Sequence, residues 1–164
     1  MTTQEIKLNE SKFFLKYMFK ASEEQNNDEF SYFLSAFLTS ARSILQYTFE
    51  HAGSVRRTSD YNKLVSKDPI LTFFKDKRDI NIHSTPIDLV KEVRIDVASF
   101  LIVRDPKSNS TPKSIPIENH NPEISTTFKF EDWKGDENVL ELSKLYVQRL
   151  ETFITEAKSI DLIG

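Results

Sequence analysis

The residues best suited to chemistry lie in one short segment, RDINIH, at residues 78–83. It begins with Arg78, continues with Asp79 and ends with His83. An arginine can hold a phosphate through two parallel hydrogen bonds and stabilise developing negative charge. A histidine has a pKa near neutrality and serves as a general acid or base, and Asp79 can orient either side chain. The segment therefore predicts a site for phosphate chemistry.

Other kinds of catalytic site have little support in this sequence. There is no cysteine, which excludes disulfides, thiolate nucleophiles and cysteine-ligated metals. The three histidines are scattered, and neither an H-E-x-x-H metal motif nor a G-x-S-x-G nucleophile motif occurs. With three glycines, the chain has neither a P-loop nor a Rossmann fingerprint. We expect no cofactor and no metal.

A helix must position the RDINIH segment, and Asp68-Pro69 gives its start signal. An acidic N-cap followed by proline at the first helical position is typical of helix N-termini. The helix should end near His83, because Pro86 restrains the residue before it to non-helical angles. Residues five apart on an ideal helix differ by about 140° in direction. Arg78 and His83 can share a face only if the last turn loosens or a second chain contributes.

Four further helices are predicted, over about residues 8–24, 26–53, 60–66 and 135–160. In the long ones, apolar residues recur at steps of three and four. Asn26, with Glu29 three residues later, resembles a capping box for the second helix. Gly53 is its expected end, where a left-handed residue is favourable, and Gly135-Asp136 open the last helix.

A β-hairpin is predicted between these helices, at about residues 90–133. Alternating polar and apolar residues at 93–97 and 128–130 favour strands. The segment 105–123 contains four prolines and is predicted to be a mobile loop. The fold class is therefore mainly α: an up-and-down bundle of four to five helices with a β-hairpin inserted before the last helix. Residues 1–164 form one domain.

Charge and hydropathy limit the possible partners. The net charge is −3, which does not favour non-specific DNA binding but allows a local basic cleft for RNA. No run approaches the roughly 20 apolar residues of a membrane helix, and the first residues lack a signal-peptide pattern. We expect a cytoplasmic protein that does not contact a membrane.

The RDINIH segment resembles the signature of the HEPN superfamily, R-x(4–6)-H with a polar residue after the arginine. The segments FSYFLSAFLTSARSILQYTFE and FEDWKGDENVLELSKLYVQRLETF also look like helices of bacterial HEPN proteins. The resemblance implies a metal-independent endoribonuclease, toxin- or defence-related, with Arg78, Asp79 and His83 as catalytic residues. It implies cleavage by the 2′-hydroxyl of the RNA, a homodimer that brings two motifs into one cleft, and an antitoxin as a further partner.

Two other functions fit the same residues. Many HEPN domains are non-catalytic binding or scaffold modules that act with a partner such as a nucleotidyltransferase. One subgroup carries a tyrosine for nucleotide modification two residues after the histidine. This chain has Thr85 there, which speaks against that version. The third interpretation is an unrelated helical bundle with a coincidental motif.

Each candidate residue also has a structural interpretation. His83 could cap the end of its helix, and Arg78 could form a solvated ion pair with a neighbouring aspartate. Arg42 and Lys77 are candidates for substrate binding, but Arg42 could instead pack its stem and solvate its head. A basic patch and an aromatic platform for bases are less favoured than a solvated surface and core packing. Those residues are Arg56, Arg57, Lys63 and Lys67, and Phe128, Phe130 and Trp133.

Overall fold

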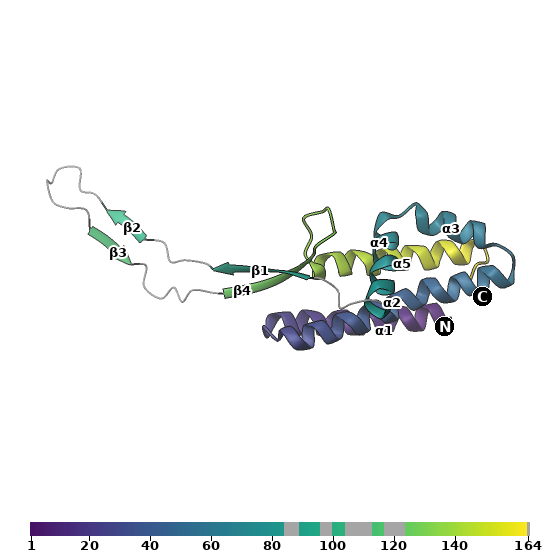
Figure 1. Ribbon diagram of the computed structural model, residues 1–164, viewed down its shortest axis with the longest axis horizontal. Coiled ribbons are helices and arrows are strands. Elements are labelled where there is room, and N and C mark those ends of the chain that lie inside the picture. The colour runs from purple at the N-terminus through teal and green to yellow at the C-terminus, as the bar shows by residue number, and fades with distance from the viewer. Residues whose placement is uncertain (84–88, 96–99, 104–112, 117–123, 164) are drawn as a thin grey trace.

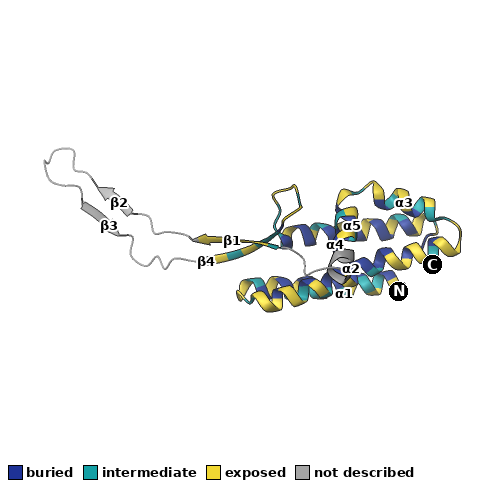
Figure 2. Ribbon diagram, in the orientation of Figure 1, coloured by how far each residue is buried: buried dark blue, intermediate teal, exposed yellow. Residues whose placement is uncertain are grey.

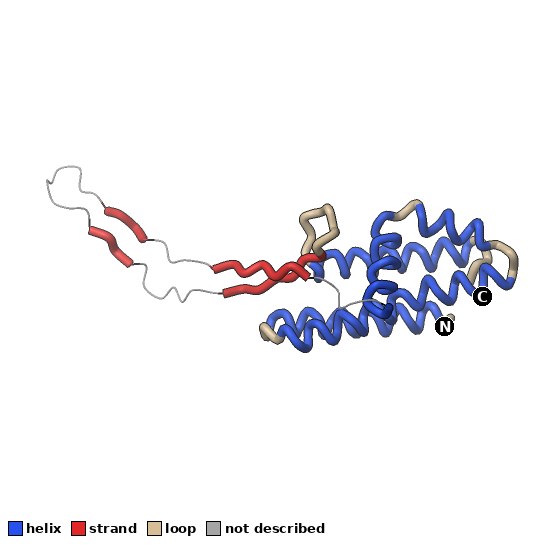
Figure 3. Tube along the Cα trace, viewed as in Figure 1, coloured by secondary structure: helices blue, strands red, loops and turns tan. Residues whose placement is uncertain are grey.

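The computed structural model describes residues 1–83, 89–95, 100–103, 113–116 and 124–163, and side chains within 1–77, 89–94 and 125–163. Its helices are α1 Thr3–Glu23, α2 Asn27–Ser54, α3 Thr58–Ser66, α4 Pro69–His83 and α5 Val139–Ser159. Its strands are β1 Leu89–Ile95, β2 Phe100–Val103, β3 Lys113–Pro116 and β4 Ile124–Phe130. The predicted fold class is confirmed: a helical bundle carries a β-hairpin before its last helix (Figures 1 and 3).

Capping side chains determine where the helices begin. The Asp68 Oδ1 accepts hydrogen bonds from the Ile70 and Leu71 amides, at 2.9 and 3.2 Å, which confirms the predicted start of α4. Asn26 caps α2 as expected, accepting from the Glu29 amide at 3.2 Å. A Thr2–Glu5 capping box starts α1 earlier than the apolar pattern predicts, because the cap lies in a polar segment.

The second helix ends at Ser54, near Gly53 as predicted, but the left-handed residue after it is Arg56, with a φ of 57°. The predicted start of the last helix at Gly135-Asp136 was wrong. The last helix begins at Val139, after Gly135-Asp136, because Asn138 and Glu141 form the capping box that satisfies its first amides. In both places a polar or flexible residue marks the neighbourhood of the helix end, but hydrogen bonding determines its position.

The core lies between α1, α2, α4 and α5, where the buried faces of the helices meet (Figure 2). Phe74 is fully buried at its centre. Its ring stacks on Tyr146 of α5 at 4.2 Å between centroids and meets Phe37 of α2 edge to face at 6.4 Å. Phe13, whose spacing from Tyr17 fits an apolar helical stripe on α1, is 52% exposed and lies on the surface against Tyr17. The apolar residues of α1 that are buried are Leu8, Leu15, Met18 and Ala21.

The strands form a ribbon that projects from the bundle at the end opposite the two termini (Figure 1). β1 pairs antiparallel with β4, from Leu89 opposite Phe130 to Ile95 opposite Ile124. β2 pairs antiparallel with β3. The predicted loop 105–123 therefore contains a strand, β3. Its Pro116 is tolerated because it sits at the end of the strand, in a ribbon with free edges. Residues 96–99, part of the predicted first strand, lie outside the described residues.

Aromatic contacts hold the base of this ribbon on the bundle. Phe128 of β4 stacks on Phe30 of α2 at 4.9 Å, and the buried Phe130 meets Phe73 and Phe74 of α4. Trp133, just after β4, meets the ring of Phe73 at 4.9 Å. These contacts confirm packing as the role of the three aromatic residues of this segment. The ribbon base is thus part of the same core that positions α4.

Candidate functional site

The RDINIH segment forms the last turns of α4, and the helix ends at His83 as expected. On a continuous helix, the positions of Arg78 and His83 differ by about 140° around the axis and by about 7.5 Å along it. The side chains of residues 78–83, and residues 84–88 with Thr85 and Pro86, lie outside the described part. The backbone geometry therefore separates the two positions within one chain.

Lys77, directly before this segment, has an internal partner. It is buried, and its Nζ lies 2.5 Å from Oδ1 of Asp132, the second residue after β4. The same Nζ lies 5.5 Å from the ring centroid of Phe73 and 5.7 Å from that of Phe130, within cation–π distance. The ion pair joins α4 to the ribbon base and thereby positions the start of the RDINIH segment.

Arg42 is buried inside the bundle. The residue is 8% exposed, and its Nε and Nη1 atoms are covered, so the expectation of a solvated head was wrong. Its charge lies near the buried phenol of Tyr146. Burial raises the pKa of the Tyr146 phenol, and the positive charge of Arg42 opposes this rise only in part. The charge of Arg42 therefore acts on Tyr146, whose ring stacks on Phe74.

The raised pKa of Tyr146 predicts a loss of stability in alkali. Because the folded state favours the neutral phenol, this contribution is complete below the ordinary pKa of 10.0 and is lost as the pH rises above it. Wild type should therefore lose more stability between about pH 8 and pH 11 than Tyr146→Phe. Urea unfolding of both proteins at the two pH values measures the difference. Equal losses would contradict the assignment.

Three basic residues around α3 have acidic neighbours. Arg57 Nε lies 2.9 Å from Asp60 Oδ2, and Lys63 Nζ lies 3.8 Å from Asp60 Oδ1. Lys67 forms an ion pair with Glu156 of α5. These partly or largely exposed pairs fit the solvated surface that the sequence favours here, since each cation already has a carboxylate beside it.

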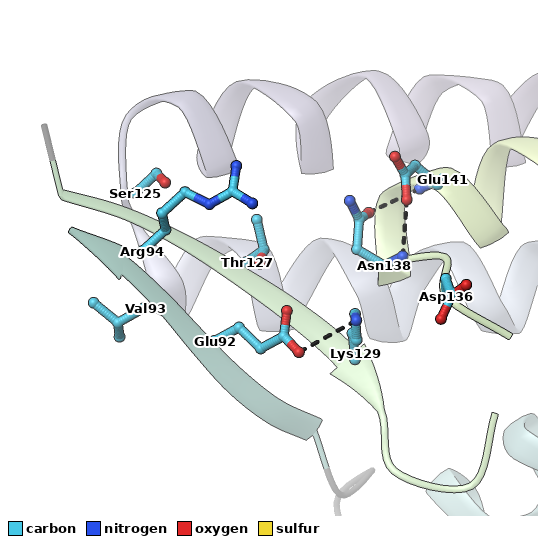
Figure 4. A pocket seen from close by; sticks show the side chains of 9 residues that line it. All are labelled: Glu92, Val93, Arg94, Ser125, Thr127, Lys129, Asp136, Asn138 and Glu141. Carbon is cyan, nitrogen blue, oxygen red and sulfur yellow. Dashed lines mark hydrogen bonds and ion pairs between the residues drawn. The ribbon is translucent and has the colours of Figure 1, made fainter. Parts of the chain in front are cut away.

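A groove of about 670 Å³ follows one face of the ribbon (Figure 4). It lies between the β1–β4 face and the start of α5, and it is polar. Within it, Lys129 Nζ lies 3.2 Å from Glu92 Oε1, while Arg94 has no ion-pair partner among the residues that the structure describes. Its lining residues are Glu92, Val93, Arg94, Ser125, Thr127, Lys129, Asp136, Asn138 and Glu141.

Sequence reasoning did not single out this groove. The alternation that predicts β1 does place Glu92 and Arg94 on one face of the strand, which was the available signal. The register with β4 adds Lys129 to that face, and the sequence alone does not give this register. The contribution of α5 depends on packing between segments that are distant in the chain.

In the described ranges, no group of three or more histidine, aspartate or glutamate residues could hold a metal ion. No helix of that part is both long and apolar enough to cross a membrane. Two acidic residues of the groove have partners: Glu92 forms an ion pair with Lys129, and Glu141 belongs to the helix cap of α5.

No family model, curated protein or solved structure matches this chain in comparisons with known proteins. The HEPN resemblance therefore depends on the RDINIH segment and on the helices around it. Of these features, the structure describes the helix order and the position of residues 78–83 at the end of α4.

Proposed function

We propose that this protein is a metal-independent endoribonuclease of the HEPN type. The observation that carries the proposal is the place of RDINIH at the end of α4, a capped helix inside a helical bundle. Arg78, Asp79 and His83 are the catalytic residues in this proposal. The ion pair of Lys77 with Asp132 supports it, because this contact holds the helix immediately before the segment.

The proposed reaction uses a nucleophile that the RNA itself supplies. A histidine accepts the proton of the 2′-hydroxyl, whose oxygen attacks the adjacent phosphorus. The bond from phosphorus to the 5′-oxygen breaks, and that oxygen leaves with a proton from a general acid. The products end in a 2′,3′-cyclic phosphate and a 5′-hydroxyl. Arg78 binds the phosphate and stabilises its developing charge through paired hydrogen bonds.

A homodimer is part of this proposal. Within one α4, the Arg78 and His83 positions point about 140° apart, so a single chain presents them poorly to one phosphate. Two chains that bring their α4 ends together can combine an arginine of one with a histidine of the other. Such a cleft also contains two histidines, one to act as base and one as acid.

The test is cleavage of total cellular RNA by purified protein in excess EDTA. Wild type should produce 2′,3′-cyclic phosphate ends, and Arg78→Ala and His83→Ala should each reduce cleavage by about 10²-fold or more. His51→Ala is the matched control, since His51 lies in the last turn of α2, on a different helix from the RDINIH segment. Circular dichroism shows whether each variant is folded.

The outcomes separate the two HEPN functions. Equal cleavage by wild type and by both folded variants contradicts the proposed catalytic residues. If folded wild type cleaves no RNA, the non-catalytic binding module, acting with a partner such as a nucleotidyltransferase, becomes the better hypothesis.

A further inference from the structure

Within the described part of the chain, the outer edge of β1 is open, whereas that of β4 faces the bundle. The two strands form a two-stranded sheet, and no other described strand pairs with β1. β4 lies between β1 and the α1–α2 hairpin (Figures 1 and 4). Phe128 of β4 stacks on Phe30, and the Thr126 amide donates to Gln25 Oε1 at 3.2 Å. The turn between α1 and α2 therefore covers the outer edge of β4 and leaves that of β1 uncovered.

That hydrogen bond also fixes the direction of the main-chain groups of β1. The Thr126 amide points toward Gln25 and hence away from β1. Residues opposite each other in an antiparallel pair exchange either two hydrogen bonds or none. Val93 lies opposite Thr126, so its own amide and carbonyl point to the open edge. By the alternation of a strand, those of Lys91 and Ile95 do so too.

We propose that the open edge of β1 pairs antiparallel with β1 of a second copy of this chain. In this pairing, Val93 lies opposite the partner's Val93 and exchanges two main-chain hydrogen bonds with it. Lys91 and the partner's Ile95 form the next hydrogen-bonded pair, and the two-fold axis generates its mate. The two ribbons then join into one four-stranded sheet. The pairing therefore uses the main-chain amides and carbonyls of Lys91, Val93 and Ile95, which point to the open edge of β1.

The charges on β1 select this register. It places Glu92 opposite the partner's Arg94, and Arg94 opposite the partner's Glu92, at the positions between the hydrogen-bonded pairs. Opposed residues are closest there, with Cα atoms about 4.5 Å apart. Registers centred on Lys91, Glu92 or Arg94 would set two like charges against each other, which is unfavourable. A register centred on Val90 avoids this conflict but pairs only the first residues of the strand.

Exposure and sheet size favour the same contact. Val93 is 52% exposed on the ribbon, and its β-branched side chain suits a cross-strand pair with its own copy. An isolated two-stranded ribbon in water is marginal. The helices support the base of this ribbon, and pairing into a four-stranded sheet would stabilise the part that extends beyond them. Lys129, already 3.2 Å from Glu92, would extend each new Glu92–Arg94 pair into a network of three charges.

This surface is separate from the cleft proposed between two RDINIH segments. Leu89 lies four residues before Val93, so the two copies of Leu89 are about 27 Å apart along the sheet. Because α4 precedes β1 in the chain, the pairing keeps the two α4 ends at opposite ends of the sheet. The inference goes beyond the ribonuclease proposal and does not depend on it.

Sedimentation equilibrium of charge variants tests the pairing. Glu92→Arg and Arg94→Glu each turn two attractive contacts into repulsive ones and should raise the dissociation constant at least about tenfold. The double variant E92R/R94E restores opposite charges across the axis and should regain most of the affinity. Lys91→Glu is the matched control, since Lys91 lies on the other face of the same strand and opposes no charge.

A single cysteine tests the register directly. The chain has no cysteine, so Val93→Cys provides one thiol at the axis. A short thiol-specific crosslinker should link Val93→Cys into dimers, and Thr155→Cys, exposed on α5, should stay uncrosslinked. The inference is overturned if wild type has the same mass as Arg94→Glu at all concentrations. It is also overturned if the dissociation constant of the double variant is no lower than those of the single variants. RNA cleavage by Arg94→Glu is measured in parallel, so loss of this contact and loss of catalysis are distinguishable.

Discussion

Replacement of Phe74 by alanine is expected to lower the free energy of unfolding by about 3–5 kcal/mol. Phe74 of α4 is fully buried, and its ring meets aromatic rings of α2, α5 and β4. Its ring stacks on Tyr146 at 4.2 Å and packs edge to face against Phe37 of α2 and Phe130 of β4. Alanine would leave a cavity between rigid rings that cannot collapse into it, which is the costly case for a large-to-small substitution.

Phe13→Ala provides the matched control for this prediction. The same substitution is made on α1, where the ring is 52% exposed and contacts mainly Phe14 and Tyr17. Its cost should stay below about 1 kcal/mol, because little of the ring is removed from water. Urea denaturation with an unchanged m-value measures both. Similar costs for the two variants would show that Phe74 is not the centre of the core.

The contrast between these two phenylalanines shows what periodicity predicts. Steps of three and four residues correctly identify α2 and α5, and a four-residue step also joins the buried residues Ile70 and Phe74 of α4. On α1 the aromatic stripe is wider than the face that packs inward, so the pattern alone cannot tell Phe13 from Leu15. Burial on a wide stripe depends on where the neighbouring helix lies, which is a tertiary property.

The candidate site likewise has features that the sequence predicts and features that appear only in the folded structure. Asp68-Pro69 predicts the start of α4 because capping is local, and RDINIH is therefore placed at its end from sequence alone. Contacts between distant segments are different: Lys77 meets Asp132, and Gln25 meets Thr126, only after the ribbon folds onto the bundle. The position of Arg42 is a third case, since a buried guanidinium breaks the expectation that arginine heads are solvated.

Removal of one or the other partner of the ion pair at the ribbon base should change the free energy of unfolding by very different amounts. Lys77 is buried between the rings of Phe73 and Phe130, whereas Asp132 is more than half exposed. Asp132→Asn leaves a buried ammonium without its carboxylate, and it is expected to cost about 1–3 kcal/mol of stability. Lys77→Met replaces that ammonium with an apolar chain of similar length, so it should be nearly neutral or slightly stabilising.

The double variant Lys77→Met/Asp132→Asn completes the measurement. With methionine already in place, loss of the carboxylate should cost little, because Asp132 is solvated without its partner and the apolar chain suits the two aromatic rings. Urea unfolding of the four proteins gives the coupling energy between the two residues. A Lys77→Met variant that loses as much stability as Asp132→Asn would mean that the ammonium itself, over the two rings, stabilises this junction. In that case α4 would be held to the ribbon by cation–π contacts and less by its ion pair.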